Sequence, residues 1–215
     1  MNEIERGKIL TKFVKPAAQG LYNPANEHDA CGVGFVAHIK GEKSHNIVEQ
    51  GLQVLDNLTH RGATGFDPLL GDGAGILVQI PDEFFRSKTD LAFELPPVGA
   101  YGIGMVFLPQ EESIRLEIQK AIEGLTEDEG QAVLGWRDVP VDSSGISQTA
   151  RDVEPVIRQI FIRRGTGCQS VQDFERKLFV IRKRAERQVK NLKELGAGGF
   201  YLSSMSARTL VYKGM

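Results

Sequence analysis

Cys31 stands between a polar leader and an apolar run, and this position points to one kind of chemistry. Residues 1–30 show no sustained periodicity, and a strand-like apolar run begins directly after Cys31. If the chain is cut before Cys31, the thiol and a free α-amine belong to the same residue. An amine that titrates near about pH 8 can accept the thiol proton. Taken alone, the stretch fits better a small apolar cysteine at the start of a core strand, and both interpretations stay open.

The glycine-rich stretch 60–75 is a second candidate for chemistry, because Arg61 stands there between a histidine and a glycine. An arginine in a tight loop is suited to orient a carboxylate, a carbonyl or a chain terminus, and a solvated surface arginine is the plainer alternative. The Gly-x-Gly-x-Gly pattern at 71–75 lacks the spacing of a dinucleotide fingerprint and leads into a strand, and the sequence contains no P-loop. Nucleotide binding is therefore not predicted.

The histidines and cysteines form no recognisable metal site. His28, Cys31, His38 and Cys168 match no common zinc spacing, and a strand would point Cys31 and His38 to opposite faces. The basic residues within 170–194 are interrupted by glutamates, which predicts a solvated helix face or, alternatively, a docking surface for another domain. A net charge of −2 gives no general attraction to nucleic acid, so nucleic acid is not predicted as a partner. A metal ion is not predicted either, because of the ligand spacing.

A length of 215 residues with 41% hydrophobic residues predicts a core in one domain, or in one domain and part of another. The two cysteines make no disulfide framework and indicate a reducing compartment. No apolar run approaches the roughly 20 residues that span a bilayer. The first residues lack the apolar segment of a signal peptide. The expected location is cytoplasmic, with no membrane partner.

Hydrophobic periodicity predicts both helices and strands after the leader. The run 33–39 is almost unbroken in apolar residues, which predicts a strand buried on both faces. Further strands are expected over 76–80, 101–108, 131–139, 156–163, 200–204 and 209–212, helices over 44–59, 110–125 and 170–194, and irregular chain over 140–154. The mixture indicates a layered α+β fold.

Several ordered blocks of the sequence resemble the amino-terminal part of the glutamate synthase large subunit. The blocks are NEHDACGVGF at 26–35, SHxIV at 44–48, LxHRGA at 58–63, GDGAGIL at 71–77, FERKL at 174–178, VIRK at 180–183 and RTxVYKGM at 208–215. The resemblance implies a class II glutamine amidotransferase domain of the N-terminal-nucleophile type, a four-layer α/β/β/α sandwich that is incomplete here at its C-terminus. It also implies that residues 1–30 are a leader or propeptide and that residues 31–215 are the truncated amidotransferase domain.

The resemblance assigns the chemistry to Cys31, whose thiol would attack the side-chain amide of L-glutamine with its own α-amine as base. Arg61 would be a positively charged support near this nucleophile. The released ammonia would pass to the remaining synthase domains, which use FMN and an iron–sulfur cluster to make glutamate from 2-oxoglutarate. A small electron-donating subunit is a further implied partner, and no cofactor is expected in this chain. The family's later His-Asn-Gly and His-x-Arg-Phe-Ser-Thr contexts do not occur in these 215 residues.

Two alternatives to a glutaminase stay open. The chain could be a non-catalytic folding or docking piece that is active only with the remaining polypeptide. It could also be another N-terminal-cysteine amide hydrolase with a different substrate. Comparing glutamine hydrolysis by the isolated chain and by the full-length polypeptide distinguishes the first alternative, and glutamine-competed labelling of Cys31 distinguishes the second.

Overall fold

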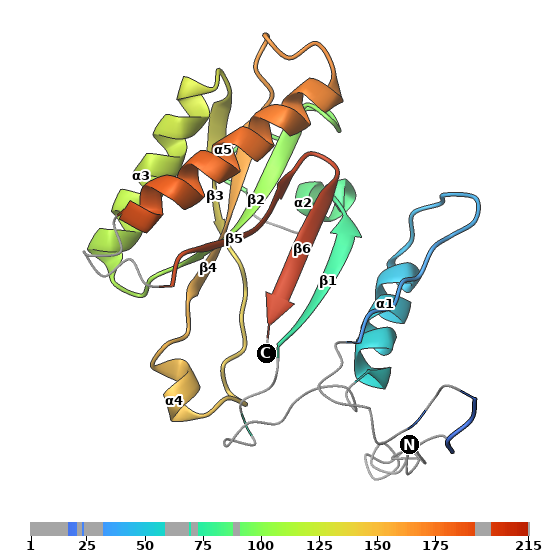
Figure 1. Ribbon diagram of the computed structural model, residues 1–215. Helices are drawn as coiled ribbons and strands as arrows, with labels where there is room; N and C mark the ends of the chain where they lie inside the picture. The colour runs from blue at the N-terminus through green and yellow to red at the C-terminus, as the bar shows by residue number, and fades with distance from the viewer. Residues whose placement is uncertain are drawn as a thin grey trace.

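The computed structural model describes residues 17–20, 23, 32–58, 69, 73–87, 91–191 and 199–214. Figure 1 shows the helices and strands of this described part of the chain. The helices are α1 (His45–Asn57), α2 (Asp82–Ser87), α3 (Glu112–Asp128), α4 (Gln148–Arg151) and α5 (Val171–Asn191). The strands are β1 (Ala74–Gln79), β2 (Tyr101–Leu108), β3 (Ala132–Asp138), β4 (Val156–Arg163), β5 (Tyr201–Ser206) and β6 (Thr209–Gly214).

The centre of the fold is a four-stranded antiparallel sheet in the order β3-β4-β2-β5. Along β2, Ile103 and Met105 belong to the core on one face, whereas Val106 and Leu108 belong to the core on the other, and all four are buried. Because both faces are covered, the strand reads as a continuous apolar run. The prediction of a strand over 101–108 is confirmed.

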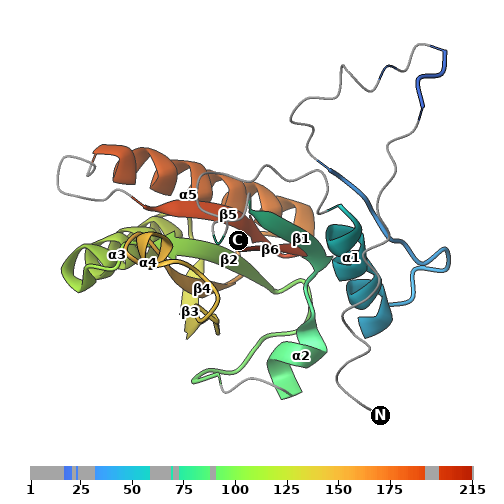
Figure 2. The same cartoon turned by 90° about the horizontal axis from the view of Figure 1, so that it is seen from below.

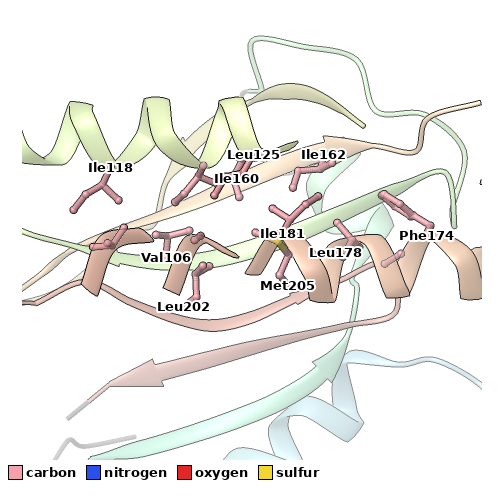
Figure 3. Close-up of a cluster of buried hydrophobic side chains, with 14 of the residues drawn as sticks. Val106, Ile118, Leu125, Ile160, Ile162, Phe174, Leu178, Ile181, Leu202 and Met205 are labelled. Carbon is pink, nitrogen blue, oxygen red and sulfur yellow. The ribbon is translucent and has the colours of Figure 1, made fainter. Parts of the chain in front are cut away.

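Helices α3 and α5 cover one face of this sheet (Figures 1 and 3). The buried residues of α5 recur every three or four positions, as in an amphipathic helix: Phe174, Leu178, Ile181, Ala185 and Val189. Gly102 of β2 allows this stripe to come close, because a Cβ there would lie 2.6 Å from Leu178 Cδ1. Just after α3, the Glu129 carboxylate lies 2.9 Å from Lys177 Nζ and 2.7 Å from Arg184 Nη1, so ion pairs also join the two helices.

The antiparallel pair β1–β6 and the short helix α2 cover the opposite face of the four-stranded sheet. Leu210 of β6, Phe161 of β4 and Phe85 of α2 are fully buried in one cluster there. The rings of Phe85 and Phe161 meet edge to face, with centroids 5.3 Å apart. The four-stranded sheet is thus packed between a helical layer and a second, smaller sheet.

Helix α1 lies beside β1 at the edge of this second sheet (Figure 2). The extended segment 32–36 lies along the helix. Cβ atoms on Gly32 and Gly34 would come within 2.8 and 2.5 Å of Leu58 and Val54. The two glycines therefore allow the backbone of this segment to lie directly on the helix.

The predicted buried strand over 33–39 is wrong. These residues are extended or irregular chain that ends in a turn, and the side chains of Val33 and Phe35 are each 91% exposed. A strand needs a hydrogen-bonded neighbour, and no strand in the described part of the chain pairs with this segment. Among the described residues, the partner of the segment is α1, which packs against its glycine side.

The remaining predicted elements agree with the structure, and two short helices are additions to them. Helix α4 lies within 140–154, where irregular chain was expected, and α2 was not predicted. These helices have four and six residues, too few for a helical period to appear in the sequence. The architecture is mixed helix and antiparallel sheet, in agreement with the predicted α+β class.

Candidate functional site

Cys31 and Arg61, the two residues predicted to act chemically, lie outside the described residues. The structure does describe the chain on one side of each. Gly32 follows Cys31 directly, and Leu58 precedes Arg61 by three residues. These two flanking residues are neighbours, because a Cβ on Gly32 would lie 2.8 Å from Leu58 Cδ2. The chain next to Cys31 and the chain that leads to Arg61 therefore meet at the C-terminal end of α1.

The glycine-rich stretch connects α1 to the start of β1. Of this stretch, residues 60–68 and 70–72 lie outside the described residues. Gly73 has a φ of +76°, a left-handed conformation that favours glycine, and it sets the entry into β1. The first residue of β1, Ala74, pairs with Gly214 at the end of β6. The position at which the glycine-rich stretch ends is therefore fixed by strand pairing.

Hydrogen bonds between polar side chains hold β6 against the four-stranded sheet. Gln159 of β4 is fully buried; it accepts a hydrogen bond from Arg137 Nη1 at 2.9 Å and donates one to Tyr212 Oη of β6 at 3.2 Å. Lys213 Nζ donates to Tyr201 Oη of β5 at 3.1 Å and lies 4.7 Å from the centre of that ring. Because β1 pairs with β6, these contacts also position the strand that follows the glycine-rich stretch.

Two of the residues weighed as metal ligands have separate surroundings in the structure. The His38 side chain is 3.9 Å from Glu42, and Cys168 is buried after β4 with its Sγ 3.6 Å from Gln131 Nε2. Within the described ranges, no group of three or more His, Cys, Asp or Glu side chains is arranged to hold a metal ion. In the same part of the chain, no helix has both the length and the apolar character needed to cross a membrane.

Comparison with known proteins matches residues 31–215 to the family of class-II glutamine amidotransferases. The chain belongs to this family. The glutamate synthase [NADPH] large chain of Bacillus subtilis is 50% identical over 206 residues, which are 96% of this chain and 13% of that protein. The protein of the same name from Azospirillum brasilense is 40% identical over 99% of this chain and 14% of its own length. Ferredoxin-dependent glutamate synthase 2, chloroplastic, from Arabidopsis thaliana is 39% identical over 94% of this chain and 12% of its own length.

These comparisons confirm the resemblance inferred from the sequence blocks. The chain is a class-II glutamine amidotransferase domain that is similar to a part of glutamate synthase large chains. It spans between 12% and 14% of the length of the three relatives. The family match begins at Cys31, the residue that the sequence singled out first.

Proposed function

We propose that this amidotransferase domain hydrolyses L-glutamine to glutamate and ammonia, as the glutaminase part of a glutamate synthase. The observation that carries the proposal is the family match over residues 31–215, together with relatives that bear the glutamate synthase name. In the proposal, residues 1–30 are a leader whose removal makes Cys31 the first residue of the mature protein. The start of the family match at residue 31 supports this division.

The proposed reaction uses one residue as nucleophile and base. The Cys31 thiol attacks the side-chain carbonyl carbon of glutamine, and its proton passes to the α-amine of Cys31. Collapse of the tetrahedral intermediate breaks the carbon–nitrogen bond, and the leaving nitrogen takes a proton to depart as ammonia. Water then attacks the glutamyl thioester, which releases glutamate and restores the thiol. The intermediate's oxyanion needs fixed donors, which we assign to the polypeptide beyond this chain.

Arg61 is proposed as a positive support near the nucleophile. The contact between Gly32 and Leu58 supports this role, because these residues flank Cys31 and lead to Arg61. The proposal also includes the four-layer α/β/β/α sandwich. The two packed sheets, with α3 and α5 on the outer face of the larger one, support three of these layers.

The wider enzyme is part of the same proposal. Ammonia would pass to the remaining synthase domains for reductive amination of 2-oxoglutarate with FMN and an iron–sulfur cluster, and a small subunit could donate electrons. Clusters of this kind need about four cysteine ligands. The chain has two cysteines, which do not suffice for one, so the cluster is assigned to other domains. We propose a cytoplasmic location.

Alanine substitution of each cysteine in the full-length protein tests the glutaminase proposal. Cys31→Ala is expected to abolish ammonia release from glutamine and to leave glutamate formation from added ammonia intact. Cys168→Ala is the matched control, because Cys168 is a buried thiol in the core beside α5 and is expected to retain glutaminase activity. Loss of both activities in Cys31→Ala would instead indicate a structural role for Cys31. Separately, the amino-terminal sequence of the mature protein would show whether the chain is cleaved directly before Cys31.

One observation favours a second candidate, in which the isolated chain is inactive and needs the remaining polypeptide. Val33 and Phe35 are 91% exposed and Leu77 of β1 is 64% exposed, so these large apolar side chains are available to a covering partner. In this proposal another part of the full-length protein covers them. The test compares glutamine hydrolysis by the isolated chain with hydrolysis by the full-length protein, and equal turnover per molecule would exclude the second candidate.

A further inference from the structure

A cavity of about 580 Å³ opens beside the turn between β4 and α5. In Figure 1 this turn lies at the top of the view, away from α1 and from the C-terminus. Its walls come from two stretches of chain, within residues 94–100 and 163–168. Ligand sites in proteins typically have volumes of roughly 300–1,000 Å³, so the cavity can hold a small metabolite.

Arg86 of α2 fixes the first wall. Its guanidinium makes two hydrogen bonds to Asp82, at 2.9 and 3.0 Å, and donates to the carbonyl oxygens of Leu95 at 2.9 Å and Pro96 at 2.5 Å. Asp82 also accepts a hydrogen bond from Tyr101 Oη at 2.7 Å. The hydrogen bond from Arg86 is the main cause of a lowered pKa at Asp82, and burial raises the pKa of Tyr101. Both groups therefore keep the protonation state that these bonds need at neutral pH.

Gln131, next to β3, fixes the second wall. Its buried side chain accepts a hydrogen bond from Gly165 N at 2.8 Å and donates towards Cys168 Sγ at 3.6 Å. Arg164 N donates to Ala100 O at 2.9 Å, which ties the two walls together. A Cβ on Gly165 would lie 1.9 Å from a backbone carbonyl oxygen, so the turn packs directly on main chain. The backbone of the two walls is therefore held in place before a ligand arrives.

Arg163 and Arg164 give the cavity its charge. Within the described part of the chain, neither guanidinium makes an ion pair or a hydrogen bond to another side chain, whereas Arg86 and Arg184 are both paired with carboxylates. The opposing charge in the lining is Glu94. Glu94 and Arg163 are both exposed to solvent, and Arg164 is half-buried. Two cations against one solvated carboxylate leave a net positive cavity, and such a cavity attracts anions.

We propose that this cavity binds a small oxyanion, with a carboxylate or phosphate group held by Arg163 and Arg164. The planar guanidinium group matches both kinds of anion, because it can donate two parallel hydrogen bonds to their oxygens. The Thr166 hydroxyl in the same lining is a further donor. The site lies on the opposite side of the fold from the chain that flanks Cys31, and it does not depend on the proposed glutaminase activity.

The test titrates the intact 215-residue chain with inorganic phosphate and with succinate at constant ionic strength, and it follows amide chemical shifts by NMR. The neutral diamide of succinate is the control ligand. The expected result is saturable shifts that map to residues 94–100 and 163–168 for one or both anions, and none for the diamide. The anion that saturates at the lower concentration identifies the ligand class. Shifts that do not saturate, or that spread evenly over lysines and arginines, would overturn the proposal.

Substitutions that remove a positive or a negative charge from the lining are expected to change the anion affinity in opposite directions. A purely structural effect would not produce this difference. Arg163→Gln and Arg164→Gln are each expected to weaken anion binding by about tenfold. Glu94→Gln is expected to strengthen it by about two- to fivefold, because it removes a repelling charge. Arg187→Gln, an exposed position on α5 with the same change of charge, is expected to leave binding unchanged. Equal losses in Arg164→Gln and Arg187→Gln would overturn the proposal.

A second readout covers the case in which an arginine variant fails to fold. Cys168 lines the cavity and is 7% exposed, so a bound anion is expected to slow its alkylation in the wild-type chain. Peptide mapping separates this reaction from alkylation of Cys31, which is expected to proceed at an unchanged rate. Equal protection of both cysteines, or of neither at saturating anion, would contradict a ligand in this cavity.

Discussion

A pair of leucine substitutions tests how the small sheet β1–β6 docks on the rest of the fold. Leu210 of β6 is 0% exposed, whereas Leu77 of the neighbouring strand β1 is 64% exposed. Leucine exceeds alanine by about three methylene equivalents worth about 0.8 kcal/mol each when buried, so Leu210→Ala forfeits roughly 2.4 kcal/mol of transfer free energy. The cavity that remains raises the expected loss to about 3–4 kcal/mol. Leu77→Ala removes the same atoms from a mostly solvated position and is expected to lose at most about 0.9 kcal/mol.

Urea unfolding of both variants, followed by the fluorescence of Trp136, measures the difference. With a denaturant dependence of about 2 kcal/mol per molar, Leu210→Ala lowers the unfolding midpoint by about 1.5–2 M and Leu77→Ala by less than about 0.5 M. A strand shifted by one residue exchanges its two faces. Equal shifts, or a larger shift for Leu77→Ala, would therefore refute the assignment of the inner face of β1–β6. As a control, the slope of the unfolding free energy against urea concentration should be unchanged in both variants, which shows that their unfolded states are alike.

Three further predictions follow from particular contacts and exposures. Gly165→Ala places a Cβ 1.9 Å from a backbone oxygen and is expected to lower the unfolding free energy by about 1–3 kcal/mol. In the control Gly167→Ala the new Cβ meets nothing within 4 Å, so its unfolding free energy is expected to stay within about 1 kcal/mol of wild type. Equal urea midpoints for the two variants would contradict this prediction. Two basic side chains of α5 lower the pKa of Glu129 from its usual 4.5, so its carboxylate stabilises the fold above that pH and the contribution disappears as pH falls through the lowered pKa. Glu129→Gln is therefore less stable than wild type at pH 7, and thermal scans down to low pH should show the gap closing; a constant gap would contradict the pairing. Phe35 is 91% exposed, so Phe35→Ala is expected to change the unfolding free energy of this chain by less than about 0.5 kcal/mol. Phe161 is fully buried, so Phe161→Ala is expected to lower it by about 3–5 kcal/mol. Comparable losses in urea unfolding would refute the assigned burial.

Long elements that bury apolar residues on a regular period could be predicted from the sequence. Helix α5 buries apolar residues that recur every three or four positions, and β2 is apolar on both faces because both are covered, so each left a clear pattern. The short helices α2 and α4 left no such pattern because neither completes more than about two turns. The anion cavity was missed for a different reason. The only local signal was the pair Arg163-Arg164 before a Gly-Thr-Gly turn, and the cavity arises when residues 94–100 fold against that turn.

The catalytic role of Cys31 was predicted from the family resemblance, whereas its surroundings could not be predicted, as the adjacent segment shows. From Val33 to Ile39 the apolar residues satisfy the pattern of a buried strand, yet Val33 and Phe35 face solvent. An unbroken apolar run is typical of a strand covered on both faces, but it does not show that partners for those faces exist. One face has a partner, since Gly32 and Gly34 pack against α1. The other face is apolar without a cover in the described part of the chain, and burying a side chain the size of Phe35 would yield about 1.5–3 kcal/mol. We expect a strand here only with a polypeptide that both pairs with this segment and covers Val33 and Phe35. Protection of these amides from hydrogen exchange should therefore rise when the full-length protein replaces the isolated chain.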